Sequence, residues 1–288
     1  RFESRGLGDV YKRQEPRVVE AAVKAVDLGI AKIILVGHFA KVKEQLEHYS
    51  CSKPDHIELH DPMTSPLKEE FSKSFYNLRK HKGITRSEAE KQVASNLVYA
   101  ALLVKHGYAD GTLSGSVETT SNVVKTALWV IGKATNVNTV SSCFLIFPKT
   151  YEPMIYADCG LVVEPNESEL VDITMAASQT CRALLKSDPR VALLSFSTKG
   201  SANHRNIEKT VGALKKLKAL LPDLLIDGEL QFDAAIDSVV GSKKAPASKV
   251  AGNANVMIFP NLDAGNIAYK ITQKLGEAEA YGLSLIHI

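Results

Sequence analysis

The sequence predicts an α/β protein of two α/β domains, each with a mostly parallel sheet flanked by helices. Short apolar runs alternate with helical patterns along the chain, which is typical of strands joined by crossover helices. In three places a glycine-bearing loop directly follows such a run, at Leu193–Ala202, Leu224–Ile236 and Val250–Lys270. The 288 residues are enough for two such domains. Loops that follow parallel strands gather at one sheet edge, so we expect ligands to bind there.

In the first half, glycine and capping signals mark where helices begin and end. Gly29 ends an amphipathic helical pattern, and Gly37 ends a β-branched run of the kind found in buried parallel strands. Thr85 and Glu88 have the capping-box spacing, which predicts the start of a long helix. The predicted elements are helix 15–28, strand 33–37, helix 40–49, strand 57–59, helix 85–103, a strand near Thr112 and helix 119–131.

The second half repeats the alternation of strands and helices. Its predicted elements are strands 142–147 and 154–157, helix 167–185, strand 191–195, helix 206–221, strands 224–227 and 256–259, and helix 264–275. The stretch from Thr135 to Thr139 separates the halves, which predicts a first domain over 15–138 and a second over 139–282.

The two ends of the chain look foreign to it. RGLGDVYKRQ near the start and LSLIHI at the end resemble translated adapter sequence from assembled environmental reads. Residues 1–14 lack the order of a signal peptide. We therefore interpret 1–14 and 283–288 as non-native tails.

Composition excludes several classes of function. The net charge is +3, and the charges of residues 1–14 supply +2 of it, so the body is nearly neutral and gives no basis for nucleic-acid binding. No apolar run approaches the roughly 18 residues of a membrane span. The four cysteines lack metal-ligand spacing, which favours inert thiols and no metal site.

Hydroxyl-bearing loops and cations point to a phosphate-bearing ligand instead. Ser116, Thr119, Thr120 and Ser121 stand at a predicted helix start, where free N–H groups and the helix dipole favour an anion. A plain N-cap is the alternative. STKGSA at 197–202 is a second candidate cradle, or an ordinary connection. Asp227, Glu229 and Asp233 have a spacing that could hold a cation, but a structural role is favoured.

These segments resemble phosphate acetyltransferase, of the phosphate acetyl/butyryltransferase family, from about Glu15 to Gly282. The resemblance implies two α/β domains with the active-site cleft between them. It makes the Gly115–Lys125 segment an acyl-phosphate loop, and it places Arg79 of LRKHKGIT in the cleft. DAGNIAYK at 263–270 and AEAYG at 278–282 also match, which implies substrate contacts from Asn266, Lys270 and Tyr281.

The chain departs from the family pattern beside the acyl-phosphate loop. Lys125 and Thr126 stand where the family has Arg followed by Pro, and Glu118 replaces a neutral or basic residue. Lysine is a point charge on a flexible stem and orients a phosphate less well than the arginine fork. These changes favour weaker phosphate handling or a different acyl phosphate.

The family resemblance implies an acyltransferase that moves an acetyl group between acetyl phosphate and coenzyme A. The family's catalytic Ser-Arg pair and its aspartate follow AEAYG, where this chain has LSLIHI, so we expect impaired turnover. The alternatives are a phosphate butyryltransferase and a catalytically silent transacetylase-like regulatory domain of a malic enzyme. An NAD-dependent decarboxylating dehydrogenase is disfavoured because no Gly-x-Gly-x-x-Gly follows a strand.

The resemblance also implies the partners. Acetyl phosphate, phosphate and coenzyme A are substrates, no cofactor is held permanently, and no metal is required. A cytoplasmic homodimer without nucleic-acid or membrane partners is expected.

Overall fold

The computed structural model describes residues 16–135 and 137–286 of the protein. The chain forms two compact units that divide between Gly132 and Lys133, and each is described by itself. The predicted tail 1–14 lies outside the described residues, as do positions 287 and 288 of the other predicted tail. The foreign origin of both tails stays a prediction.

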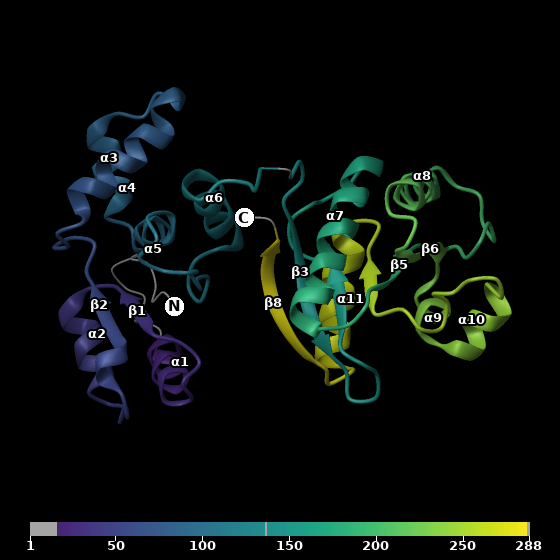
Figure 1. The fold of residues 1–288 in the computed structure, drawn as a ribbon, viewed down its shortest axis with the longest axis horizontal. Coiled ribbons are helices and arrows are strands. Elements are labelled where there is room, and N and C mark those ends of the chain that lie inside the picture. The colour runs from purple at the N-terminus through teal and green to yellow at the C-terminus, as the bar shows by residue number, and fades with distance from the viewer. Residues whose placement is uncertain (1–15, 136, 287–288) are drawn as a thin grey trace. The chain divides into compact units, whose positions relative to one another are not determined.

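Unit 1, the unit that ends at Gly132, begins with two helices packed against a pair of parallel strands (Figure 1). Strand β1 has all four of its residues buried, as the apolar run predicts. It runs in register with β2, from Ile33 opposite Ile57 to Val36 opposite His60. The elements are α1 (Pro16–Asp27), β1 (Ile33–Val36), α2 (Phe39–Leu46), a short 3-10 turn (Pro54–His56) and β2 (Ile57–His60).

The rest of unit 1 is helical and differs from the prediction in three places. Helix α3, over Lys68–Arg79, was not predicted. The predicted helix 85–103 is wrong: the chain breaks at Ser95, whose backbone is extended, and forms two helices. Buried Asn96 starts the second and donates from Nδ2 to the Val36 carbonyl at 3.0 Å, a contact distant in sequence. The strand near Thr112 is also wrong, because no neighbouring strand pairs with it in the described chain. The elements are α3 (Lys68–Arg79), a 3-10 turn (Lys80–Lys82), α4 (Arg86–Val93), α5 (Asn96–Lys105) and α6 (Thr120–Val130).

The predicted capping box of Thr85 is confirmed. Its hydroxyl accepts from the Glu88 backbone N–H at 3.2 Å, and the Glu88 carboxylate accepts from the Thr85 backbone N–H at 2.8 Å. We expect Thr85→Ala to destabilise unit 1 by about 1 kcal/mol, because the Glu88 N–H at the start of α4 loses its acceptor and the Glu88 carboxylate loses the Thr85 hydroxyl as a donor. Urea unfolding followed by circular dichroism measures this. Thr85→Ser is the control and should keep most of the stability; equal losses in both variants would contradict the capping role.

Unit 2, from Lys133 onward, contains a six-stranded sheet in the order β6-β5-β7-β4-β3-β8. Its strands are parallel across β6-β5-β7-β4, and β3 runs antiparallel to β4 and β8. This confirms the predicted mostly parallel α/β fold. The strands are β3 (Ser141–Phe147), β4 (Met154–Ala157), β5 (Arg190–Leu194), β6 (Leu225–Leu230), β7 (Val256–Ile258) and β8 (Glu279–Ile286).

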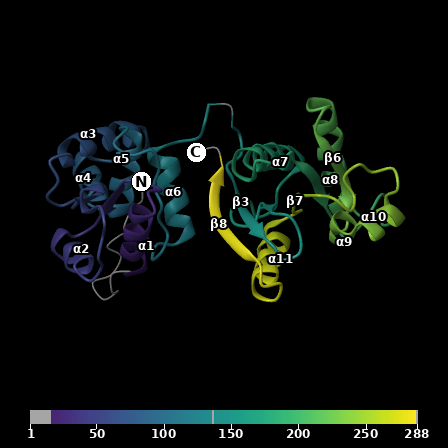
Figure 2. The same cartoon turned by 60° about the horizontal axis from the view of Figure 1, so that its bottom comes forward.

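Helices cover both faces of this sheet, each over its own apolar layer (Figures 1 and 2). Helices α7 and α8 pack on the face that includes Cys143 and Leu145, and α9 and α11 pack on the face of Phe144 and Ile146. The alternation along β3 therefore sorts its side chains between two cores. The helices are α7 (Glu167–Thr180), continued by a π-helical turn (Cys181–Leu185), then α8 (Arg205–Leu220), α9 (Phe232–Ile236), α10 (Ser238–Lys244) and α11 (Leu262–Lys274).

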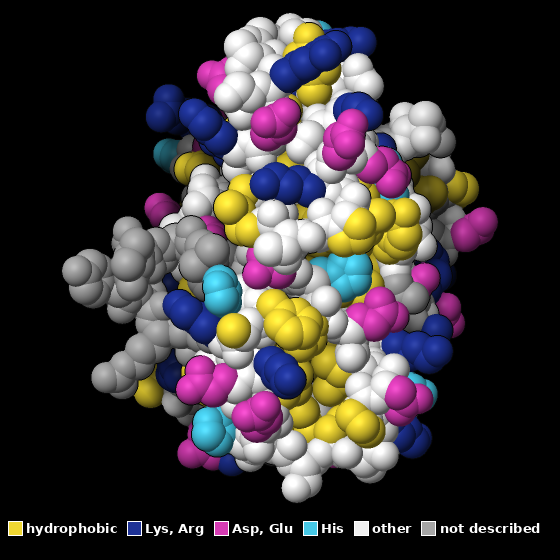
Figure 3. Space-filling view, turned by 90° about the vertical axis from the view of Figure 1, so that its left-hand side faces the viewer, with side chains coloured by type: hydrophobic (Ala, Val, Ile, Leu, Met, Phe, Trp, Pro, Cys, Tyr) yellow, Lys and Arg dark blue, Asp and Glu magenta, His cyan; other side chains and the backbone are white. Residues whose placement is uncertain are grey.

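Side chains of different types are mixed on one face of unit 1. On the face of unit 1 in Figure 3, basic and acidic side chains are interspersed, with separate apolar patches between them. Within the described part of the chain, no helix combines the length and the apolar character that crossing a bilayer requires.

Candidate functional site

Helix α6 carries the best-formed group of predicted site residues. Thr119 is its N-cap, with Oγ1 accepting from the Asn122 N–H at 3.2 Å. Thr120 and Ser121 follow in the first turn and are exposed. Ser121, Lys125 and Trp129 are four residues apart, so they line one face of the helix. The hydroxyls thus lie at the positive end of the helix dipole, one turn from Lys125.

The structure brings Arg79 and Lys125 together over one aromatic ring. The Arg79 Cζ lies 4.5 Å from the centroid of the Trp129 ring, and the Lys125 Nζ lies 4.3 Å from it. Arg79 is the last residue of α3, and Trp129 comes from α6, so the cluster joins two helices. A cation this close to an indole face gains about 0.5–2 kcal/mol, depending on how far it is desolvated. We call Arg79, Lys125 and Trp129 the Trp129 cluster.

Neither cation of the Trp129 cluster is neutralised within the described residues. Arg79 and Lys125 form no ion pair and no side-chain hydrogen bond there. The nearby Glu118, which the sequence suggested would repel a phosphate, instead accepts a hydrogen bond from Asn122 Nδ2 at 3.2 Å. Two cations without a carboxylate partner form a suitable site for a phosphate group.

Ser116 lies on a different surface from the Trp129 cluster. The backbone turns at Gly115, whose φ of +108° favours glycine, and the turn packs near Val123 of α6. Ser116 then lines a cavity of about 420 Å³ between residues 113–118 and the α1 residues Arg17, Val18, Ala21 and Ala22. Among these lining residues there is no Arg79 and no Lys125, so Ser116 and the two cations do not share one pocket in unit 1.

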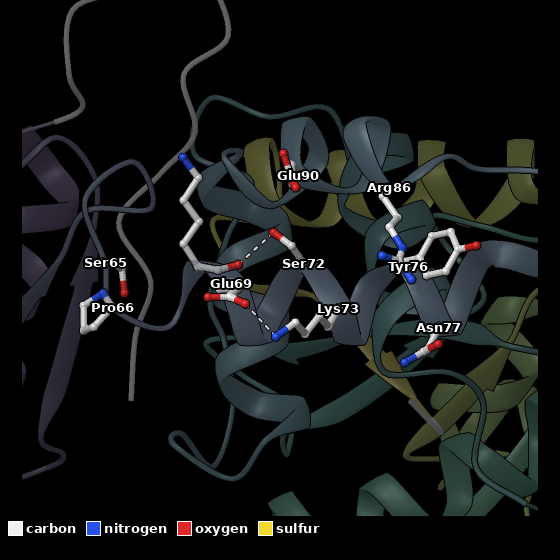
Figure 4. A pocket seen from close by; sticks show the side chains of 10 residues that line it. Ser65, Pro66, Glu69, Ser72, Lys73, Tyr76, Asn77, Arg86 and Glu90 are labelled. Carbon is white, nitrogen blue, oxygen red and sulfur yellow. Dashed lines mark hydrogen bonds and ion pairs between the residues drawn. The ribbon is translucent and has the colours of Figure 1, made fainter.

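A larger cavity of unit 1, about 690 Å³, lies along α3 and α4 (Figure 4). Two of its charges form an ion pair, Lys73 with Glu69 at 2.6 Å, and the Arg86 Cζ lies 5.7 Å from the Tyr76 ring centroid. No residue that the sequence analysis proposed for the site lines it. Size alone therefore does not identify it as the functional site.

In unit 2, the Asn266 side chain forms a hydrogen bond to the backbone of a neighbouring loop. Its Nδ2 donates to the Cys159 carbonyl at 3.2 Å, which ties α11 to the loop after β4. One residue earlier, Gly265 lies so close that an added Cβ would be 2.3 Å from the Asp158 carbonyl oxygen. Only glycine allows α11 to approach the β4 loop this closely. The Asp263–Lys270 segment of α11 is thus a packing contact as well as a candidate ligand site.

Asp158 anchors the same loop from inside. It is buried, and its carboxylate accepts from the Ser142 hydroxyl at 2.5 Å and from the backbone N–H groups of Gly160, Leu161 and Val162 at 2.7, 3.1 and 3.2 Å. A carboxylate with this many donors behaves as a structural anion. It holds residues 158–162 against the start of α11.

Lys270 and Tyr281 lie on opposite faces of the unit 2 sheet. Tyr281 stands opposite Leu145 and packs edge-on against Phe147 at 5.6 Å, on the α7 face. Lys270 belongs to α11 on the other face, 5.8 Å from the ring of Tyr269, which in turn stacks on Phe144 at 4.1 Å. The sequence resemblance groups these two residues, whereas the alternation of the strands separates them.

The polar groups of the STKGSA loop are bound by carboxylates of the same chain. The buried Glu229 carboxylate accepts from the Ser197 hydroxyl at 2.9 Å and from the Gly200 N–H at 2.7 Å, while Lys199 pairs with Asp227. The N–H that would face a phosphate is therefore bound to a carboxylate. This favours the ordinary connection over the phosphate cradle.

The three carboxylates of this region are each paired separately. Burial raises the pKa of Asp227, but hydrogen bonds from Lys199 and Ser248 outweigh it and leave the pKa below its usual range. Asp233 pairs with Lys244 at 2.8 Å. In the described residues, no group of three or more His, Cys, Asp or Glu side chains could hold a metal ion. The structural role of these carboxylates is thus favoured.

The buried cysteines should be unreactive in the folded protein. Burial raises the pKa of Cys143 to about 12 and of Cys181 to about 11, and it raises the pKa of Cys159 further. Cys51 is only half-buried. We expect a disulfide thiol reagent at pH 8 to modify Cys51 alone in the native protein, and all four cysteines after denaturation. Cys51→Ser should abolish the native reaction; rapid release of a second equivalent would contradict this burial.

Two contributors to the site were missed in the sequence. Trp129 follows Lys125 by four residues, a spacing that would have placed both on one helical face. Asp158 has no comparable signal, because its donors come from β3 and from its own loop only after folding.

Comparison with known proteins gives one consistent result. The family described as Phosphate acetyl/butaryl transferase matches residues 12–286. Phosphate acetyltransferase of Clostridium acetobutylicum is 42% identical over 274 residues, which cover 93% of this chain and 82% of that protein. Phosphate acetyltransferase of Thermoanaerobacterium thermosaccharolyticum is 41% identical over 273 residues, with the same coverage of 93% and 82%.

Solved structures agree. A phosphotransacetylase from Streptococcus pyogenes superposes with a TM-score of 0.86 at 35% identity, covering 95% of this chain and 82% of that one. The EutD phosphotransacetylase from Staphylococcus aureus gives a TM-score of 0.83 at 36% identity, covering 95% and 83%. Sequence and fold thus point the same way, and the chain belongs to the phosphate acetyl/butaryl transferase family.

Proposed function

We propose that the protein transfers an acetyl group between acetyl phosphate and coenzyme A. The observation that carries the proposal is the Trp129 cluster, in which Arg79 and Lys125 converge without a carboxylate partner in the described residues. A phosphate group would supply the missing negative charge. Family membership supports acyl transfer as the reaction class.

In the proposed reaction, the coenzyme A thiolate attacks the acetyl carbonyl carbon of acetyl phosphate. The new carbon–sulfur bond forms, the bond from carbon to the phosphate oxygen breaks, and phosphate leaves with the electron pair. The thiol proton goes to solvent or to the leaving phosphate. Arg79 and Lys125 would stabilise the negative charge that gathers on the leaving group, which is the electrostatic role expected of such cations.

Direct transfer is favoured over an acyl-cysteine intermediate. A cysteine nucleophile must be a thiolate and must be accessible. Burial raises the pKa of Cys143, Cys159 and Cys181, so these thiols stay protonated near neutral pH. Cys51 is half-buried, but it packs against the core formed by α1, β1 and α2, whereas Trp129 packs against a different core. A ternary complex in which both substrates are bound together follows from this.

The other predicted contacts extend the proposal. Thr119, Thr120 and Ser121 would hydrogen-bond the phosphate at the start of α6, and Ser116, Asn266, Lys270 and Tyr281 would contact the remaining parts of the two substrates. We also propose a homodimer and a cytoplasmic location, both supported by the family resemblance alone. Light scattering of the purified protein tests the dimer.

A thioester-formation assay with acetyl phosphate and coenzyme A tests the function. We expect thioester to appear only when both substrates are present, and propionyl and butyryl phosphate should react more slowly. Faster reaction with butyryl phosphate would favour the butyryl alternative.

The expectation of impaired turnover stays a prediction. The same assay tests it by comparing this chain with one extended by the C-terminal sequence of a relative. Absence of thioester from both proteins would overturn the proposal.

A further inference from the structure

We infer that Trp129 is a positioning residue that holds Arg79 and Lys125 as one two-cation site for a phosphate group. This inference rests on the proposed function, and it adds a residue and a reason why Lys125 can serve there. Trp129 itself touches the two cations.

The indole is fixed before any ligand arrives. Trp129 is half-buried and packs against the apolar core of unit 1, which includes Phe71, Phe75 and Leu102. Its backbone belongs to α6, and the packing of the ring against this core restricts its rotamer. A ring held in this way is a rigid surface on which flexible side chains can be aligned.

Lys125 needs such alignment more than an arginine would. Its ammonium is a point charge at the end of four methylene groups, and it lacks the planar fork that orients a phosphate. Because Lys125 and Trp129 are four residues apart on α6, the ring attracts the ammonium along the helix face. The ring therefore limits where the ammonium can lie, which lowers the entropy lost when an anion binds.

The same ring also allows the two cations to be close together. Both charged centres lie within 4.5 Å of one centroid. The charges are therefore at most about 9 Å apart, a distance comparable with the Debye length at physiological salt, and they repel each other. The attraction of each cation to the indole ring offsets part of that repulsion. The geometry thus suits the dianion of phosphate or of an acyl phosphate.

Trp129 is the one tryptophan in the sequence, so its fluorescence reports on this cluster directly. The test is a fluorescence titration of the full chain with inorganic phosphate and with acetyl phosphate, with chloride at matched ionic strength as the control. We expect a saturable change with both phosphates and none with chloride. Lys125→Met and Arg79→Gln should each weaken that response at least tenfold.

Two replacements of Trp129 separate positioning from packing, with acetyl phosphate affinity measured by calorimetry. Trp129→Phe keeps an aromatic face and should weaken binding by less than about threefold, and Trp129→Leu, which keeps only apolar bulk, by roughly tenfold. Melting temperatures of the two variants show whether packing alone has changed. Equal affinities in wild type, Trp129→Phe and Trp129→Leu would overturn the inference, as would a saturating phosphate that leaves the fluorescence unchanged.

Failure of the positioning role of Trp129 can be distinguished from failure of the proposed acetyl transfer. Thioester formation that persists unchanged in Trp129→Leu supports the function and overturns the positioning role. A phosphate response that requires Lys125 and Arg79, without thioester formation by this chain or by the extended one, supports the two-cation site and overturns the proposed reaction. No response to either phosphate overturns the two-cation site itself.

Discussion

Replacing Arg79 by glutamine is expected to weaken acetyl phosphate binding by roughly 10–100-fold, because a hydrogen bond to a charged group contributes about 1.5–3 kcal/mol. Arg79 is half-buried at the end of α3, and in the described chain its guanidinium contacts the Trp129 ring rather than an acid. The variant loses the cation and is shorter than arginine, but it keeps a planar polar group that can donate hydrogen bonds. Calorimetric titration with acetyl phosphate measures the effect whatever the rate of turnover.

Arg86 offers a matched control for Arg79. It is also an arginine of unit 1 over an aromatic ring, but it lines the cavity along α3 and α4 in Figure 4. Arg86→Gln should leave acetyl phosphate affinity within about twofold of wild type, since its ring partner is Tyr76 and not Trp129. If Arg86→Gln weakened binding as strongly as Arg79→Gln, the effect would be a general one of charge, and the Arg79 site would be wrong.

Asp158→Asn is expected to destabilise unit 2 by about 3 kcal/mol. The carboxylate accepts from the Ser142 hydroxyl and from the N–H groups of Gly160, Leu161 and Val162. An amide has one acceptor oxygen, so its NH2 group must face some of these donors in a buried position. The melting temperature should fall by roughly 5–10 °C in thermal unfolding followed by circular dichroism.

The exposed Asp223 provides the control for Asp158. Asp223→Asn removes the same charge from the same unit and should change stability by less than about 0.5 kcal/mol. Substrate affinity gives a second measurement, because the loop after β4 is bound to Asn266 of α11. If Asp158→Asn had the same melting temperature as wild type, the hydrogen bonds of Asp158 would add no net stability.

The sequence by itself determined the order of most elements and the chemistry that the protein offers. Helix and strand periodicity and the capping residue Thr85 act over a few neighbouring residues, so they can be read directly along the chain. The hydroxyls at the start of α6 and the cations Arg79 and Lys125 were also visible, because residue type fixes charge. Helices α3, α9 and α10 and strand β8 were not predicted. Helices α9 and α10 are too short to show a clear period, α3 is rich in polar residues, and part of β8 lies in the predicted tail 283–288.

Only the tertiary structure decided which of these groups work together. Asn96 breaks the long predicted helix because its amide reaches Val36, sixty residues away. Glu229 accepts hydrogen bonds from the donors of the STKGSA loop. The alternation of side chains along β3 and β8 places Tyr281 on the sheet face opposite to Lys270. Trp129 brings Arg79 and Lys125 to one ring. Such contacts depend on how distant segments pack, and local spacing carries no information about distances between segments that meet only after folding.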